Sequence, residues 1–207
     1  DNAEQRLAEH LHNNLDWQPF ICHSAAVLPE YREYERGIAT WLNASLGPLM
    51  ENYLLNLSRS TAPSSLAVMQ SSGGTISADQ AARSAVNLLL SGPAGGLAAV
   101  EWLATTSGNN QLMTFDMGGT STDVALYDGR IGLTNEGSIG SYPVAVPMVD
   151  MHTIGAGGGS LAWLDTGNLL QVGPQSAGAS PGPACYGLGG TEPTVTDANL
   201  VLGRLPA

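Results

Sequence analysis

The sequence predicts a mixed α/β protein, and three features of its 207 residues support this fold class. Segments in which apolar residues recur at helical spacing alternate with short runs of β-favouring residues. The composition is 43% hydrophobic with 26 Gly and 12 Pro, which is typical of a globular chain with many turns. A chain of this length can bury a substantial core and form one or two domains.

The chain is strongly acidic, because 7 Lys and Arg stand against 18 Asp and Glu and the formal net charge is −11. Such a surface repels nucleic acid and anionic membranes, so we expect neither as a partner. A phosphate site must therefore use backbone N–H groups, a metal ion or basic residues from elsewhere. Only Cys22 and Cys185 are present, and no signal peptide or spanning apolar run is found. We therefore expect a reducing, cytoplasmic setting.

The first part of the chain is expected to be mainly helical. Ala3, Leu7 and Leu11 recur every four residues, which predicts an amphipathic helix over residues 1–14. The β-favouring residues of segment 18–24 predict a short strand after it.

A long amphipathic helix is expected from Glu30 to about Leu57. Pro48 lies inside it and should kink the helix or divide it in two. A polar loop with a proline then leads from Arg59 to Ser65.

The next segment predicts a strand, a turn and two helices. Leu66–Gln70 has the pattern of a buried strand, and Ser71–Gly74 has that of a tight turn at its carboxyl end. Ser77, with an amide side chain three residues later, predicts the start of a helix that runs to about Leu90. A second helix, rich in small residues, is expected through Ala104.

The stretch from Met113 to Leu126 predicts a β-hairpin with a polar, glycine-rich turn. An apolar run ends at Asp116, two glycines and three hydroxyl residues follow, and a second carboxylate is Asp123. Glycines let a ligand approach the main chain, and the N–H groups of such turns suit phosphate oxygens. The two carboxylates are candidates for holding a hydrated Mg²⁺. The candidate phosphate-binding residues are Gly118, Gly119, Thr120, Ser121 and Thr122. An ordinary hairpin, whose polar residues only form the turn, is the alternative.

Asp150 and His152 follow the next apolar run and lie two residues apart on an expected strand. Their side chains should therefore project to one face, where an Asp–His pair suits a metal ion or the activation of water. Both are candidate metal ligands together with Asp116 and Asp123. A simple Asp–His hydrogen bond is the alternative.

Residues 155–160 form a run of five small residues before Ser160, with no room for a stable strand or helix. Such a run either lets the backbone approach a ligand or connects ordered segments flexibly. We expect a ligand loop, with Gly157, Gly158 and Gly159 at the ligand. In the irregular segment that follows, Cys185 is either a thiolate ligand or nucleophile, or a small buried residue in a tight loop. Thr196 or Asp197 is expected to cap a last helix.

Six stretches of the chain resemble the ATP-dependent hydantoinase/oxoprolinase family, in its hydantoinase A subunit. The segment from Asp116 to Asp123 also resembles the second phosphate-binding hairpin of the wider superfamily of actin, Hsp70 and sugar kinases. The six stretches are Val27–Arg36, Met69–Gly74, Leu90–Gly96, Phe115–Val124, Asp150–Ser160 and Val172–Leu205.

This resemblance implies an actin/Hsp70/sugar-kinase-like, ribonuclease H-like mixed sheet with flanking helices, as a partial lobe of a larger protein. Residues 1–64 would then complete a preceding lobe, and residues 65–207 would form the ATPase-like domain. The chemistry implied is hydrolysis of a cyclic amide, as in N-methylhydantoinase or 5-oxoprolinase. ATP phosphorylates the amide oxygen, and water then opens the ring.

The resemblance also implies roles and partners. Asp116, Asp123 and His152 would be the catalytic residues, with ATP and Mg²⁺ as cofactors and a second divalent metal as a further option. Expected partners are a small cyclic amide, the rest of the protein's own chain and a hydantoinase B-type subunit.

One departure from the family pattern limits these expectations. Family members carry another Asp-Gly-Gly-Thr-type loop near their amino end, but none precedes Asp116, and Gly73-Gly74-Thr75 lacks the aspartate. These residues should hold half an ATP site, with weak nucleotide binding and no turnover alone. Two alternatives stay open, namely a subunit of an ATP-dependent ketone carboxylase and a non-catalytic scaffold with an ATPase fold.

Overall fold

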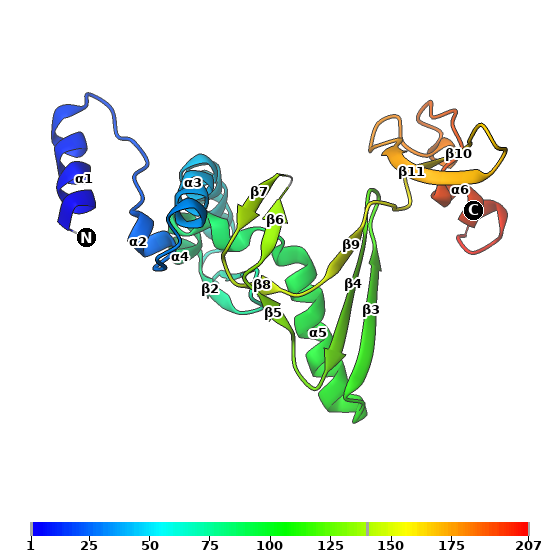
Figure 1. The fold of residues 1–207 in the computed structure, drawn as a ribbon, viewed down its shortest axis with the longest axis horizontal. Helices are drawn as coiled ribbons and strands as arrows, with labels where there is room; N and C mark the ends of the chain where they lie inside the picture. Colours follow the sequence, from blue (N-terminus) through cyan, green and yellow to red (C-terminus); the bar gives the residue numbers. More distant parts are fainter. Residues whose placement is uncertain (1, 140, 207) are drawn as a thin grey trace. The chain divides into compact units, whose positions relative to one another are not determined.

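The structure, a computed structural model, describes residues 2–139 and 141–206 (Figure 1). The chain divides into two compact units. The first consists of Asp1–Ser107 and Arg130–Asp150, and the second of Gly108–Gly129 and Met151–Ala207. The predicted boundary between residues 64 and 65 lies inside the first unit.

Three helices begin the first unit: α1 (Asn2–Asn14), α2 (Ser24–Val27) and α3 (Glu33–Thr61). The predicted helix over residues 1–14 is confirmed, and α3 runs through Pro48 as a single helix. The predicted strand over residues 18–24 is wrong. Residues 18–23 have no regular structure, because this segment packs on α3 instead of pairing with a strand. A Cβ on Gly47 would overlap the ring of Phe20, so only glycine lets the ring lie on the helix.

The polar side chain of Asn43 connects α3 to the elements that follow it. Asn43 is fully buried, with 0% of its surface exposed. Its Nδ2 donates to the carbonyl of Arg83 at 2.9 Å, and its Oδ1 accepts the N–H of Val86 at 3.1 Å. One side chain therefore satisfies a backbone group at the end of the helix Ala78–Arg83 and another in the segment after it.

Replacing Asn43 by alanine is expected to destabilise the protein by about 2 kcal/mol, because two backbone groups near a buried site lose their partner. The thermal denaturation midpoint of the full-length protein should fall by several degrees. Asn52→Ala, at an exposed position of the same helix, is the matched control. Equal midpoints for the two variants would contradict this role of Asn43.

A small hairpin and three helical segments follow α3. They are β1 (Ala67–Met69), β2 (Thr75–Ser77), α4 (Ala78–Arg83), the 3-10 helix η1 (Ala85–Leu88) and α5 (Ser91–Ser107). Of these, α4 and η1 pack against α3. The predicted cap is confirmed, since the hydroxyl of Ser77 accepts the N–H of Gln80 and the Gln80 side chain accepts the N–H of Ser77. The helix ends at Arg83 and not near Leu90.

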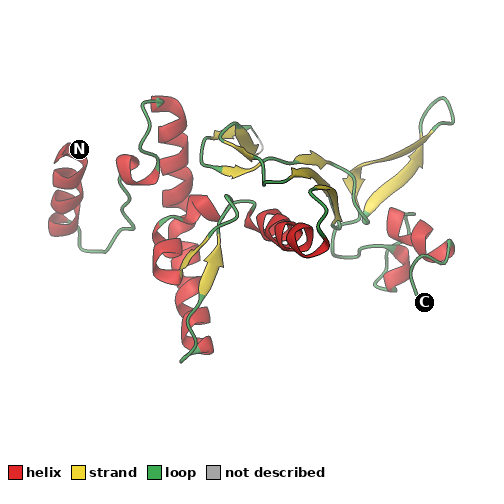
Figure 2. Ribbon diagram, turned by 90° about the horizontal axis from the view of Figure 1, so that it is seen from below, coloured by secondary structure: helices red, strands yellow, loops and turns green. Residues whose placement is uncertain are grey.

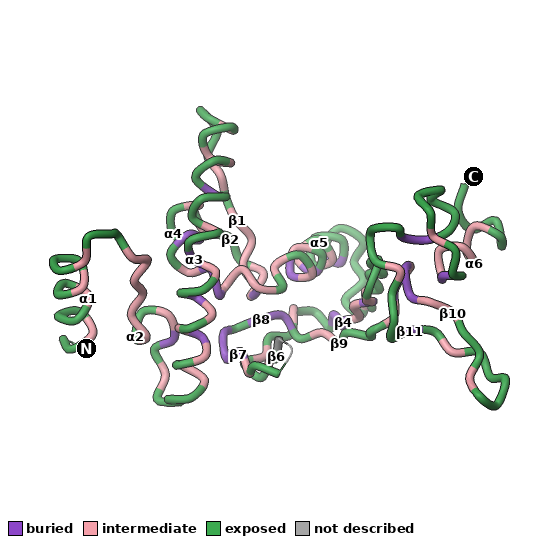
Figure 3. Tube along the Cα trace, turned by 90° about the horizontal axis from the view of Figure 1, so that it is seen from above, coloured by how far each residue is buried: buried purple, intermediate pink, exposed green. Residues whose placement is uncertain are grey.

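Two short antiparallel pairs complete the first unit. They are β5 (Leu133–Thr134) with β8 (Met148–Val149), and β6 (Gly137–Ile139) with β7 (Tyr142–Val144). The core to which these strands contribute joins residues far apart in the sequence. Buried residues are drawn in purple in Figure 3. The buried members of this core are Leu28, Ala39, Val86, Val144, Ala145, Val146 and Met148.

The second unit contains a three-stranded antiparallel sheet in the order β3-β4-β9, labelled in Figure 1. Figure 2 draws all strands of the protein in yellow. The strands of this sheet are β3 (Gln111–Met117), β4 (Thr122–Asp128) and β9 (His152–Ile154). The predicted hairpin is confirmed, since β3 pairs with β4 over its whole length. The remaining elements are β10 (Ser160–Leu164), β11 (Leu170–Ser176), η2 (Ala184–Tyr186) and α6 (Val195–Val201). No helix among the described residues is long and apolar enough to cross a membrane.

Candidate functional site

The two carboxylates of the hairpin lie side by side on one face of the sheet. Asp123 of β4 stands opposite Asp116 of β3 on one side and opposite Thr153 of β9 on the other. Residues directly opposite each other project to the same face, so all three side chains share it. The hydroxyl of Thr153 donates to Oδ1 of Asp123 at 2.7 Å and orients that carboxylate. Asp116 is exposed and Asp123 is half-buried.

The same register separates His152 from these carboxylates. His152 stands opposite Val124, one residue along the strand from Thr153, and therefore projects to the opposite face. Asp150 precedes β9, belongs to the first unit and donates its N–H to the carbonyl of Gly132. The predicted set of four metal ligands is thus corrected. Of the predicted ligands in the second unit, Asp116 and Asp123 share a face and His152 lies on the opposite one.

A pair of carboxylates still fits Mg²⁺, which binds through one or two carboxylates and keeps several waters. Among the described residues no group of three His, Cys, Asp or Glu side chains is placed to hold a metal ion together. The site therefore suits a hydrated ion better than a fully caged one.

The turn of the hairpin has backbone N–H groups without an acceptor among the residues that the structure describes. The N–H of Gly118 donates to the carbonyl of Ser121 at 2.9 Å and closes the turn. The N–H groups of Gly119, Thr120 and Ser121 donate to no acceptor in the described part of the chain. Gly119 and Thr120 are exposed. Successive free N–H groups of this kind form an anion-binding surface.

Thr122 does not belong to that surface. Its side chain is buried, with 2% exposed, and its hydroxyl donates to the carbonyl of Ala156 at 2.6 Å. The prediction that this hydroxyl contacts phosphate is therefore corrected. Thr122 instead connects the hairpin to the glycine-rich loop.

That loop, which we call the glycine clasp (residues 157–159), packs directly on the hairpin turn. Gly158 N–H donates to the carbonyl of Gly118 at 2.9 Å, and Gly159 N–H donates to that of Gly119 at 2.7 Å. Gly157 N–H donates to the hydroxyl of Ser160 at 2.9 Å. All three N–H groups are thus engaged within the protein. The sequence predicted these glycines at the ligand, but their N–H groups instead hydrogen-bond within the protein and support the turn.

The hydrogen bonds that Gly158 and Gly159 donate to the turn also set the direction of the turn's free N–H groups. A peptide bond is planar and trans, so the C=O of one residue and the N–H of the next point in opposite directions. Because the clasp binds the carbonyls of Gly118 and Gly119, the N–H groups of Gly119 and Thr120 point away from it. The clasp therefore holds two donors toward the open side of the turn.

A single carboxylate organises the segment after the clasp. Asp197 accepts the N–H of Cys185 at 2.7 Å, and the N–H and hydroxyl of Thr194 at 2.9 and 2.8 Å. Partial burial acts to raise the pKa of Asp197, but the hydrogen bonds from Cys185 and Thr194 outweigh it and hold the pKa well below its usual value. The cap of α6 is Thr194, and Asp197 is its partner three residues on, so neither predicted cap residue holds that position.

The carboxylate of Asp197 also accepts a hydrogen bond from the thiol of Cys185 and raises the pKa of that thiol. A thiol with a raised pKa is a poor nucleophile and a poor metal ligand. The surroundings of Cys185 thus disfavour a catalytic or metal-binding thiolate, and the prediction of a buried residue is also wrong, because Cys185 is exposed.

Positive charge is scarce near the hairpin. Among Lys and Arg residues, the second unit contains only Arg204 in its sequence, and the Arg204 guanidinium donates to the side chain of Asn199. Phosphate charge would therefore be met by backbone N–H groups, a metal ion or basic residues from outside this unit, as the composition predicts.

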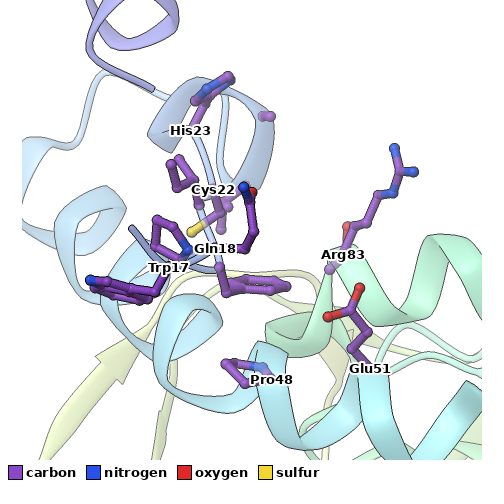
Figure 4. A pocket seen from close by; sticks show the side chains of 13 residues that line it. Trp17, Gln18, Cys22, His23, Pro48, Glu51 and Arg83 are labelled. Carbon is purple, nitrogen blue, oxygen red and sulfur yellow. The ribbon is translucent and has the colours of Figure 1, made fainter. Parts of the chain in front are cut away.

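A cavity of about 770 Å³ lies in the first unit, between the irregular segment before α2 and the helices α3 and α4 (Figure 4). It contains none of the predicted site residues. Its lining includes Trp17, Phe20, Cys22, His23, Glu51 and Arg83.

The second unit thus presents a glycine turn flanked by two carboxylates, with backbone N–H groups that have no acceptor among the described residues. Residues 36–207 match the hydantoinase/oxoprolinase family, and the chain belongs to this family.

Three relatives illustrate the match. Caprolactamase subunit alpha of Pseudomonas jessenii is 44% identical over 191 residues, which cover 90% of this chain and 27% of that protein. The crystal structure of ATP-dependent caprolactamase from the same organism superposes with a TM-score of 0.78 at 41% identity, over 100% of this chain and 30% of that one.

The 5-oxoprolinase of Dictyostelium discoideum is 37% identical over 199 residues, or 88% of this chain and 15% of that protein. Nucleotide-free acetone carboxylase superposes with a TM-score of 0.76 at 28% identity, over 99% of this chain and 30% of that one. The chain thus spans 15% to 30% of the length of these relatives.

Proposed function

We propose that this chain supplies the phosphate-binding part of an ATP-dependent enzyme that hydrolyses a cyclic amide. The observation that carries the proposal is the hairpin turn, where free N–H groups at Gly119, Thr120 and Ser121 adjoin a strand pair that presents Asp116 and Asp123 on one face. Membership of the hydantoinase/oxoprolinase family supports it. So do the relatives named as an ATP-dependent caprolactamase and as 5-oxoprolinases.

The chemistry explains why such an enzyme would use a nucleotide. An amide carbonyl is a poor electrophile and its oxygen is a poor leaving group. ATP would supply the phosphoryl group that converts this oxygen into a leaving group before water opens the ring. The N–H groups of the turn would hold phosphate oxygens, and such positioning accounts for most of the catalysis of phosphoryl transfer.

The carboxylates have two candidate roles within this proposal. Asp116 and Asp123 would hold the hydrated Mg²⁺ that neutralises developing charge on the phosphates. Alternatively, one of them would position the attacking group. The hydrogen bond from Thr153 fixes one oxygen of Asp123 and leaves the other free for either role.

The proposal extends to the setting of the protein. A hydantoinase B-type subunit is the proposed partner, since the caprolactamase relative is named as a subunit alpha. Both cysteines are free, which suits the reducing conditions of the cytoplasm.

A second candidate function is ATP-dependent carboxylation of a ketone. The superposition on acetone carboxylase favours it, because a ketone enol oxygen can be phosphorylated by the same site. The two functions differ in whether the phosphorylated species is a lactam or an enol.

An isotope experiment on the full-length protein distinguishes these functions. Cyclic amides labelled with ¹⁸O at the carbonyl are incubated with the protein and Mg-ATP, and the released phosphate is analysed by mass spectrometry. Phosphorylation of the amide oxygen predicts ¹⁸O in the phosphate, one atom per ring opened. ATP-dependent uptake of bicarbonate into a ketone would support the carboxylase instead. A protein that binds no Mg-ATP would contradict both and favour a scaffold.

A further inference from the structure

We infer that Thr196 is a positioning residue for the nucleotide site, an inference that rests on the proposed function. Thr196 is the second residue of α6 and lies outside the hairpin. Its backbone N–H and its hydroxyl both donate to the carbonyl of Gly158, each at 2.8 Å. One residue thus provides two hydrogen bonds to a single carbonyl of the glycine clasp.

The residue that Thr196 holds is the one that contacts the turn. Gly158 accepts from Thr196 through its C=O and donates through its N–H to Gly118. Space is tight at this point, since a Cβ on Gly158 would lie 2.7 Å from Oγ1 of Thr196. Movement of Thr196 would therefore be transmitted to the clasp.

The helix that carries Thr196 is itself fixed. Its first turn is closed by the reciprocal hydrogen bonds of Thr194 and Asp197, and Asp197 also binds the backbone of Cys185. On the other side, the N–H of Ala162 donates to the carbonyl of Pro193 at 2.9 Å, which ties the start of α6 to β10. Thr196 is therefore a rigid support for the clasp.

The effect of Thr196 on the free N–H groups of the turn is transmitted through two planar peptide bonds. The clasp fixes the carbonyls of Gly118 and Gly119, and these planes carry the N–H groups of Gly119 and Thr120. The hydroxyl of Thr196 therefore stabilises the orientation of the groups proposed to bind phosphate, although Thr196 itself touches no ligand.

The test compares three variants of the full-length protein. Thr196→Val keeps the shape and the backbone N–H but removes the hydroxyl, whereas Thr196→Ser keeps the hydroxyl. Thr191→Val is the matched control, because Thr191 is exposed and its hydroxyl has no partner among the described residues. The dissociation constant for Mg-ATP is measured by calorimetry. Hydrogen exchange is followed without nucleotide at the hydrogen-bonded amides of the turn and the clasp, those of Gly118, Gly158 and Gly159.

Thr196→Val is expected to weaken Mg-ATP binding about threefold to tenfold, the effect of one hydrogen bond, and to speed exchange in the turn. Thr196→Ser and Thr191→Val should match the wild type in both measurements. Unchanged exchange in Thr196→Val, or a serine variant as impaired as the valine variant, would overturn the inference. A wild-type protein that binds no Mg-ATP would instead overturn the proposed function. The exchange measurement would still test whether Thr196 stabilises the clasp and the turn.

Discussion

Replacing Gly157 by alanine is expected to lower ATP-dependent turnover strongly, whereas Gly155→Ala in the same loop should leave it intact. A Cβ on Gly157 would lie 2.6 Å from the carbonyl oxygen of Gly118 and 2.7 Å from the amide nitrogen of Ser121. Both are backbone atoms, so relief requires the clasp and the turn to move apart. A Cβ on Gly155 would meet nothing within 4 Å.

The expected cost of this overlap is about 1–3 kcal/mol of stability. The effect on turnover should be larger, about 100-fold, because small displacements of positioned groups are costly in catalysis. Turnover and the thermal denaturation midpoint of the full-length protein are measured for both variants. Wild-type turnover in Gly157→Ala would mean that clasp and turn do not touch in the working protein.

Replacing either carboxylate of the hairpin by its amide is expected to lower turnover about 100-fold or more, because both proposed roles, holding Mg²⁺ and positioning the attacking group, require the negative charge of the carboxylate. Asp116→Asn and Asp123→Asn keep the shape of the side chain and remove its charge. Asp128→Asn, an exposed aspartate at the end of the same strand as Asp123, is the control and should behave as wild type.

The two roles of these aspartates give different results. If both hold Mg²⁺, each substitution should raise the Mg²⁺ concentration needed for half-maximal turnover. If one positions the attacking group, its variant should lose turnover with an unchanged Mg²⁺ requirement. Full activity in both variants would contradict the enzymatic proposal at this site and support a scaffold.

Local features of this protein followed from the sequence with little ambiguity. The hairpin around Gly118, the capped start of α4 at Ser77 and the small-residue helix α5 each depend on residues close together in the chain. Glycine at a turn, or a hydroxyl three residues before an amide, favours one local conformation through short-range sterics and hydrogen bonds.

Strand pairing was harder to predict, and the error at His152 shows why. Side chains alternate between faces along a strand, so a shift of one residue reverses the face on which each one lies. The prediction grouped His152 with the hairpin aspartates as a metal ligand. Only the pairing of β4 with β9 shows that Thr153, and not His152, lies beside Asp123.

The sequence by itself determined the α/β class, the family and the glycine turn with its two aspartates, because these depend on residue types at short spacing. The tertiary structure decided which groups of that site are free. The N–H groups of Gly158 and Gly159 are engaged by the turn, whereas those of Gly119 and Thr120 are not. Every residue except proline carries the same backbone N–H group, so residue types do not show which acceptor it binds. That acceptor is fixed only when distant segments pack together.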